Sequence, residues 1–367
     1  MSDWPFVSVV VPVFNGVRTI EELLTSLLAL DYPVDRYEII IVDNGSTDDT
    51  RQIVERYPVT LLEEREIRGA AAARNKGIMH ARGDIIAFTD ADCVADRNWL
   101  KMLVTAHQDP TIGAFAGEVK GQEPARTRVE AVYNYNRILS PFHQGKASAD
   151  GGPKLELKRR APIQPRTSLE RLWVRLGLIT YYRKRPPIPP LHHAPTANVA
   201  YRRTVLEEIG LFDASLVHGE DPDLAWRMQL NSSYRFHPAP EAIVYHKYQT
   251  TLSEVFSHRR GYGLARILIL DKYIGLTPDI RRQAILESCL NIILGCPHFI
   301  ATLGYRSLRA LVYGQPYPTY LYEPLVNWVS DLGYNYGRIK TCLTGVRVAR
   351  QTYPPLIEKF ASETTKV

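Results

Sequence analysis

The sequence predicts an α/β fold in which an open, mainly parallel sheet carries helices on both faces, followed by a helical C-terminal region. Short runs of β-branched and aliphatic residues alternate with segments of helical periodicity, as in sheets built from strand–helix units. Two of these runs end in carboxylates, at the edge where open α/β sheets bind their ligands. The chain has 367 residues, of which 45% are hydrophobic, so it can build a substantial core.

The first 90 residues contain the clearest alternation. Residues 7–13 form a nearly continuous apolar run, which is typical of a strand buried on both faces. A helical stripe of apolar residues follows, made of Ile20, Leu23, Leu24, Leu27 and Leu28. A second strand is expected over residues 38–43, and Ser46 or Thr47 can cap a helix over residues 48–56. The series is completed by a short strand, an Ala-rich helix and a fourth strand, over residues 59–62, 69–81 and 85–89.

Asp90-Ala91-Asp92 directly follows the fourth expected strand. Because that strand is apolar on both faces, the carboxylates at its end must be solvated, paired or bound to metal. Two acids with one spacer can present oxygens to a hard divalent cation that also grips phosphates. The motif alone is a weak signal, but Asp43 ends the second expected strand at the same edge of the sheet.

Five short motifs in the chain resemble, in this order, family 2 glycosyltransferases of the GT-A fold. They occupy residues 11–15 (VPVFN), 43–48 (DNGSTD), 74–77 (RNKG), 90–92 (DAD) and 220–227 (EDPDLAWR). The resemblance covers about residues 5–260 and implies a Rossmann-like, mixed sheet with helices on both faces. It also implies an inverting transfer of a sugar from a nucleoside-diphosphate sugar, with UDP expected, to a glycan or glycolipid hydroxyl.

The resemblance assigns a group of residues to the nucleotide: Pro12, Phe14, Asn15, Asp43, Arg74, Asp90 and Ala91. Asp43 can accept a hydrogen bond from a uracil imide, and Arg74 can contact the base or a phosphate. Arg259 and Arg260 could supply cations to the diphosphate. The plainer alternatives are a turn carboxylate at Asp43, a surface ion pair at Arg74 and a helix cap at Asn15.

The resemblance also implies Mn²⁺ or Mg²⁺ as cofactor, with Asp92 as the better ligand. Asp90 is expected to bind ribose hydroxyls or the metal through water, and His246 to complete the metal shell. A dication bridging the phosphates would neutralise charge on the leaving diphosphate, and hard oxygen ligands suit either ion. The alternative for His246 is a strand-end histidine bonded to the backbone.

Glu220 and Asp221 follow Gly219 and open an amphipathic helix. By the resemblance, Asp221 is the general base that takes the acceptor proton, and Glu220 orients the acceptor. Residues 196–203 resemble the segment that lines the donor sugar and acceptor. Carboxylates at a helix N-terminus are also stabilised by free N–H groups, so plain capping is the alternative.

The basic charge of the chain is concentrated in one segment. Residues 145–190 hold eleven Lys/Arg and three Asp/Glu, so their charge of +8 exceeds the +6 of the whole chain. A basic, Pro-rich, mobile insert is therefore expected over residues 145–195 of the catalytic domain. Charge confined to one segment argues against a nucleic-acid-binding face. A solvated loop without function is the alternative.

The catalytic domain is expected over residues 1–260 and a membrane-interfacial tail over residues 261–367. Apolar stretches over residues 262–276 and 285–304 are bracketed by arginines and favour amphipathic helices lying on an anionic membrane surface over a spanning helix. The alternative is an ordinary helical subdomain. The N-terminus shows no signal peptide, and the four cysteines show no metal or disulfide spacing, so a peripheral or monotopic protein at the cytoplasmic face is expected.

Two other classes of function remain open from the sequence. A nucleotidyltransferase that makes sugar nucleotides also uses an acidic metal site on an α/β sheet, but usually has a Gly-rich phosphate loop after its first strand. A non-catalytic membrane scaffold on the same fold would not need an intact Asp92 and Asp221. The motif Q-x-x-R-W of processive synthases is absent from the sequence, which favours the addition of one sugar over polymerisation.

Overall fold

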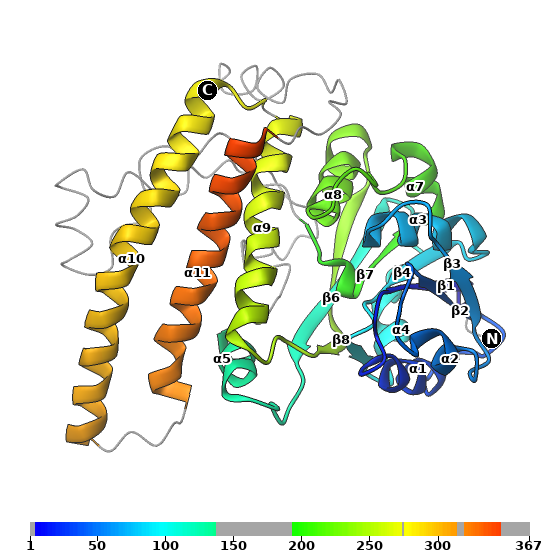
Figure 1. The fold of residues 1–367 in the computed structure, drawn as a ribbon. Helices are drawn as coiled ribbons and strands as arrows, with labels where there is room; N and C mark the ends of the chain where they lie inside the picture. The colour runs from blue at the N-terminus through cyan, green and yellow to red at the C-terminus, as the bar shows by residue number, and fades with distance from the viewer. Residues whose placement is uncertain (1–3, 137–192, 274, 314–318, 346–367) are drawn as a thin grey trace. The chain divides into compact units, whose positions relative to one another are not determined.

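The computed structural model describes residues 4–136, 193–273, 275–313 and 319–345 (Figure 1). The expected insert over residues 145–195 falls almost wholly outside these ranges. The described residues form two compact units, one containing residues 4–126 and 193–248 and the other the helices after residue 248. Helix α5 (Arg128–Asn136) is divided between them. The division falls at Tyr248, whereas the sequence placed it after residue 260.

The first unit is built on an eight-stranded sheet with the order β3-β2-β1-β4-β7-β6-β8-β5. The first three strands, β1 (Val7–Val13), β2 (Tyr37–Asp43) and β3 (Thr60–Glu63), run parallel to one another and to β4 (Ile85–Phe88), as predicted. The other half is mixed. Its members are β5 (Cys93–Ala95), β6 (Ile112–Gly121), β7 (Val199–Arg202) and β8 (Arg235–His246).

Helices cover both faces of this sheet, which confirms the predicted fold class. On one face lie α1 (Ile20–Leu28), α2 (Thr50–Val54) and α4 (Trp99–Leu103). On the other lie α3 (Ala70–His80), α7 (Arg203–Ile209) and α8 (Glu220–Asn231). Alternate residues of β1 point to opposite sides, so Val9 and Val11 pack in the first core and Val10 in the second.

Two local details differ from the expectation. Helix α2 begins after Asp49, and Ser46 and Thr47 instead contact the turn after β1. The short 3₁₀ segment Thr196–Asn198 precedes β7 and was not expected. It places Thr196 beside the acidic start of α8, because its backbone N–H and hydroxyl both bond to Asp221.

The second unit contains three long helices: α9 (Leu252–Tyr273), α10 (Pro278–Tyr313) and α11 (Thr319–Thr344). Helices α9 and α11 touch through their backbones, because a Cβ atom at Gly337 would overlap the carbonyl of Arg260. Helix α10 continues through Pro297. Over Pro278–Val312 its length and composition would allow it to cross a membrane, since an 18-residue stretch within it has a mean hydropathy of 1.5 and 11% of that stretch is buried. The sequence had instead favoured helices lying on the membrane surface over residues 262–276, most of which belong to α9, and over residues 285–304 within α10.

Candidate active site

The turns after β1 and β2 are joined by the side chain of Asn15. Asn15 has a positive φ of 51° and its amide oxygen accepts the N–H of Thr47 at 2.8 Å. Its own N–H donates to the hydroxyl of Ser46 at 2.9 Å. Helix α1 begins only after Thr19. Asn15 therefore acts on the neighbouring turn and not as the helix cap that the alternative required.

Asp43 ends β2 and is 3% exposed. One of its carboxylate oxygens accepts the N–H of Ser46 at 3.0 Å, which is a turn interaction. Its neighbour Asn44 fixes the next loop, because its amide group donates to the carbonyls of Glu64 and Ile67 at 2.9 Å. Phe14, by contrast, is 56% exposed at the end of β1. An apolar ring thus lies uncovered at the strand edge that the sequence assigned to the nucleotide.

Arg74 lies on α3 and joins acidic residues from two distant motifs. Its Nη2 donates to Asp90 Oδ1 at 2.8 Å and its Nη1 donates to Glu220 Oε1 at 3.0 Å. Asp221 Oδ1 lies 4.0 Å from the same Nη1. The guanidinium is buried, so the surface ion pair considered from the sequence does not occur. Burial acts to lower the pKa of Arg74, but the three carboxylates outweigh it and raise that pKa.

Helix α3 can hold Arg74 in this position because it approaches the sheet closely. A Cβ atom at Gly77 would overlap the side chain of Val10 in β1. Only glycine fits this contact without movement of the helix or the strand. The glycine of the RNKG motif thus has a packing role, and the arginine three residues before it is carried to the edge of the sheet.

Asp221 lies in the first turn of α8, directly after Gly219, whose φ of 93° is left-handed. Both of its oxygens are hydrogen-bonded by Thr196: the N–H donates to Oδ2 at 3.1 Å and the hydroxyl donates to Oδ1 at 2.9 Å. Burial, followed by the charge of Glu220, raises the pKa of Asp221 to about 7, against the opposing effect of Arg74. A carboxylate with a pKa near neutrality is suited to take and release a proton.

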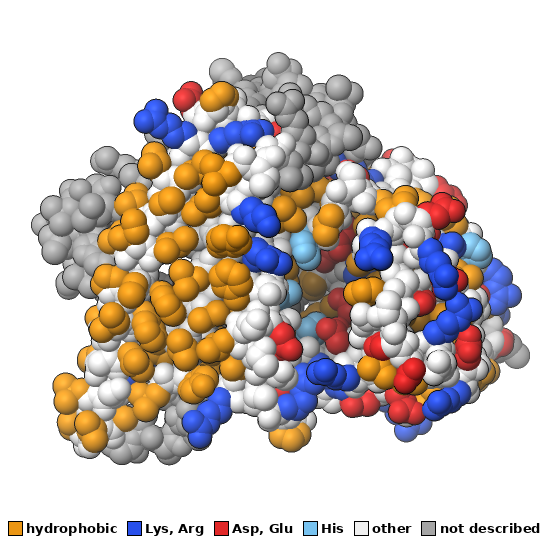
Figure 2. Space-filling model, in the orientation of Figure 1, with side chains coloured by type: hydrophobic (Ala, Val, Ile, Leu, Met, Phe, Trp, Pro, Cys, Tyr) orange, Lys and Arg blue, Asp and Glu red, His pale blue; other side chains and the backbone are white. Residues whose placement is uncertain are grey.

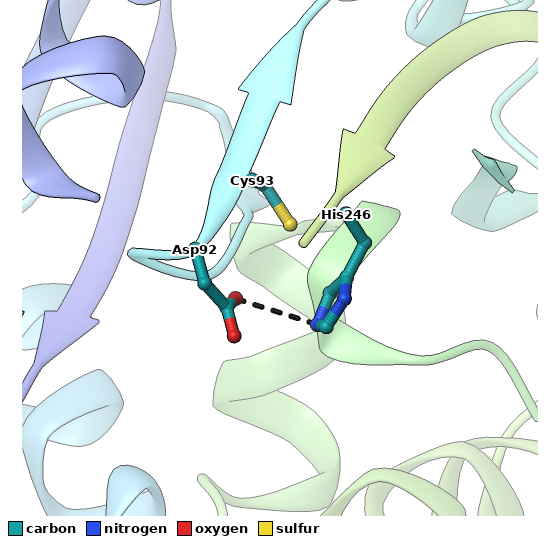
Figure 3. Close-up of side chains that lie close together, drawn as sticks. All are labelled: Asp92, Cys93 and His246. Atoms are coloured by element: carbon teal, nitrogen blue, oxygen red, sulfur yellow. Dashed lines mark ion pairs between the residues drawn. The ribbon is translucent and has the colours of Figure 1, made fainter. Parts of the chain in front are cut away.

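Asp92, which directly precedes β5, and His246, which ends β8, lie close together where these two strands pair (Figure 3). His246 Nε2 lies 3.4 Å from Asp92 Oδ1. Asp92 Oδ1 and His246 Nδ1 are both buried and have no hydrogen-bond partner among the described residues. The alternative of a strand-end histidine bonded to the backbone through Nδ1 is therefore not observed among the described residues. The oxygen and nitrogen donors fit a divalent cation, since two ligands at about 2.1 Å from one ion lie roughly 3.4 Å apart in tetrahedral geometry.

Cys93 is a member of this group that the sequence analysis did not assign. Ligand atoms of Asp92, Cys93 and His246 all lie within 4.8 Å of one another. Burial raises the pKa of the Cys93 thiol well above its usual value. Knowledge of the strand pairing would have identified it. In the β5–β8 register Cys93 is directly opposite His246, which lies 153 positions later in the sequence.

Six of the predicted site residues form two charged groups in the first unit, and Cys93 joins the second group. Asp90 belongs with Arg74, Glu220 and Asp221, whereas Asp92 belongs with His246 and Cys93. Pro12 and Ala91 are partly exposed. Arg259 and Arg260 lie on α9 of the second unit, and their assignment to a diphosphate stays a prediction.

The sheet, its acidic edge and the helices on both faces define a nucleotide-diphospho-sugar transferase fold of the GT-A type. Residues 8–210 match the family described as glycosyl transferase family 2, so the chain belongs to this family and is a glycosyltransferase. This confirms the predicted family and class of enzyme. The matched range includes the whole Asp90-Ala91-Asp92 motif and ends before Glu220.

Individual relatives show how far the similarity extends. Glycosyltransferase AglE of Haloferax volcanii is 25% identical over 355 residues, which cover 93% of this chain and 98% of AglE. The pre-mycofactocin glycosyltransferase of Mycobacterium tuberculosis is 28% identical over 266 residues, which cover 70% of this chain but only 46% of that protein.

A solved structure supports the fold assignment. The mannosyltransferase PcManGT from Pyrobaculum calidifontis, in complex with GDP-Man and Mn²⁺, aligns with a TM-score of 0.53 and 22% identity. The alignment covers 93% of this chain and 88% of the other. At this identity the similarity concerns the fold.

Proposed function

We propose that this glycosyltransferase moves a sugar from a nucleoside-diphosphate sugar, UDP-linked in our assignment, to a hydroxyl of a glycan or glycolipid with inversion at the anomeric carbon. The observation that carries the proposal is Asp221, whose carboxylate is oriented by two hydrogen bonds from Thr196 and whose pKa is raised to about 7. An inverting transfer requires one such base and no carboxylate nucleophile.

Asp221 would take the acceptor proton as the hydroxyl oxygen attacks the sugar. Glu220, held by Arg74 at 3.0 Å, would orient the acceptor. The same arginine also binds Asp90, which we assign to the donor. The buried guanidinium of Arg74 therefore holds one residue assigned to the donor and one assigned to the acceptor. Pro12, Phe14, Asn15, Asp43 and Ala91 line the neighbouring strand ends and are assigned to the nucleotide.

Mn²⁺ or Mg²⁺ would be held by Asp92 and His246, with Asp90 contributing through water. A bound dication would supply charge neutralisation for the departing diphosphate. The unpartnered Asp92 Oδ1 supports this assignment, as does the Mn²⁺ and GDP-Man complex of the related mannosyltransferase.

We further propose that the second unit associates with the cytoplasmic face of a membrane. Exposed apolar side chains recur along α10 at Leu286, Ile293, Ile300, Leu308 and Leu311. In Figure 2 hydrophobic side chains gather over α10 and α11. A lipid-linked acceptor would fit such a location, and a basic stretch near an anionic leaflet would strengthen the attachment.

The experiment that tests the reaction is a panel of nucleotide sugars with and without Mn²⁺. We expect metal-dependent release of a nucleoside diphosphate from one donor and a β-linked product from an α-linked donor, read by NMR at the anomeric centre. Release of pyrophosphate would indicate a nucleotidyltransferase. Failure to turn over any donor, with the fold intact, would favour a non-catalytic scaffold.

A further inference from the structure

Cys93 lies beside the metal position because of strand register. In the antiparallel β5–β8 pair Cys93 is directly opposite His246, and directly paired residues place their side chains on the same face of a sheet. The preceding residue, Asp92, lies just before the start of β5, and its Oδ1 is 3.4 Å from His246 Nε2. In Figure 3 the Cys93 sulfur lies above the line that joins the Asp92 carboxylate to the His246 imidazole.

These three side chains differ in their preference for metals. A carboxylate suits Mg²⁺ and Mn²⁺, an imidazole suits Mn²⁺ and Zn²⁺, and a thiolate strongly favours Zn²⁺ and related soft ions. Ligands of one tetrahedral zinc ion lie roughly 3.4–3.7 Å apart, given bonds of about 2.1 Å to oxygen or nitrogen and 2.3 Å to sulfur. The donor atoms are already within 4.8 Å, so a side-chain adjustment of about 1 Å would close the site.

We propose that Cys93 is a third protein ligand at this position for thiophilic divalent cations, so that Zn²⁺ or Cd²⁺ binds through Asp92, Cys93 and His246 and excludes the catalytic ion. The proposal rests on the metal site of the proposed function. On binding, the S–H bond is replaced by a sulfur–metal bond, and the thiol proton is released to solvent.

The burial of the three side chains and their donor types determine how an ion enters the site and which ion is bound. Cys93 is 1% exposed, whereas the side chain of Asp92 is 43% exposed, so an ion entering from solvent meets the carboxylate before the sulfur. Zn²⁺ outranks Mn²⁺ at sites of this donor type even without sulfur, and a thiolate widens that difference. Zn²⁺ is therefore expected to displace Mn²⁺ and to inhibit transfer.

The test is a Cd²⁺ titration of the full-length protein, followed by the ultraviolet sulfur-to-cadmium charge-transfer band. We expect one equivalent to bind with this band in the wild type. Cys93→Ser should abolish the band and raise the Cd²⁺ dissociation constant by at least about 100-fold, since even outer-shell changes at metal sites cost about 10–100-fold. The double variant Cys289→Ser/Cys296→Ser, on α10, is the matched control and should keep the band.

Mn²⁺ binding, measured by electron paramagnetic resonance on the same samples, separates the two proposals. Mn²⁺ should bind to the wild type and to Cys93→Ser but not to Asp92→Asn. Absence of Mn²⁺ binding to the wild type would refute the metal site itself. Normal Mn²⁺ binding with no cadmium band, or with a band that survives in Cys93→Ser, would overturn the role of Cys93. The ¹¹³Cd chemical shift of the wild type tests sulfur ligation without any variant.

Discussion

At the scale of single residues, Arg74 contacts residues on both the donor side and the acceptor side of the proposed active site. It contacts Asp90 on the donor side and Glu220 on the acceptor side, and its charge limits the rise in the pKa of Asp221. The sequence predicted an arginine that contacts the nucleotide directly. It could not show the acidic partners, which are 16 and 146 positions away and meet Arg74 only after folding.

Thr196 provides a test of the base through pH. Its hydroxyl stabilises the ionised form of Asp221, so Thr196→Val should raise the pKa of this carboxyl by about 1–2 units, because a hydrogen bond to a charged group contributes about 1.5–3 kcal/mol. Since the base must be ionised, kcat/KM should rise with pH through about 7 in the wild type and level off above it, and the variant should level off at a higher pH.

The measurement is a pH–rate profile of kcat/KM for both proteins. Thr196→Ser keeps the hydroxyl and is the control, with a profile close to that of the wild type. A purely structural role of Thr196 would instead lower the rate of the valine variant equally at every pH, and that result would contradict the pKa argument.

At the scale of elements, the sequence predicted those parts of the fold whose pattern is local. Strands β1, β2 and β4 are buried on both faces and appear as continuous apolar runs, and α8 begins at the acidic motif as expected. The mixed half of the sheet could not be predicted in this way, because β7 and β8 obtain their places from pairing with distant strands. The position of Cys93 depends on the same pairing.

Helices α9 and α11 give a stability prediction for the second unit. Gly337→Ala would push a methyl group into the carbonyl of Arg260, so we expect a loss of about 1–3 kcal/mol, as in other overpacked contacts. Gly304 on α10 has no atom within 4 Å of its virtual Cβ. Gly304→Ala should therefore be neutral or stabilise by up to about 1 kcal/mol, because alanine favours helix.

Thermal unfolding of both variants in detergent, followed by circular dichroism, makes this comparison. Equal melting temperatures for Gly337→Ala and the wild type would mean that α9 and α11 do not touch through their backbones.

At the scale of the whole molecule, the chain combines a catalytic unit with a helical unit whose α10 has an exposed apolar stripe. From the sequence, residues 285–304 were the apolar stretch expected in this region, and a span was not favoured there because the stretch contains Pro297, and proline normally interrupts a helix. The structure keeps α10 continuous from Pro278 to Tyr313, which makes it longer than the roughly 20 residues that a membrane span requires.

Membrane attachment is tested by sedimentation of the full-length protein with anionic liposomes. We expect binding that high salt weakens but does not abolish. Ile293→Glu/Ile300→Glu should release the protein, since a charge in hydrocarbon costs about 2.5–3.5 kcal/mol per residue. Val34→Glu, at an exposed apolar position of the first unit, should leave binding unchanged. Wild-type protein that stays in the supernatant at low salt would contradict the attachment.

The central claim is that Asp221 is the base of an inverting transfer and takes no part in nucleotide binding. Asp221→Asn keeps the shape of the side chain but cannot accept the acceptor proton, so transfer should fall by at least about 100-fold, the lower range for a lost general base. The decisive measurement is calorimetric titration of this variant with UDP and Mn²⁺ beside its transfer rate. Unchanged nucleotide affinity with lost transfer is the predicted result, whereas a parallel loss of affinity, or transfer at the wild-type rate, would contradict the account.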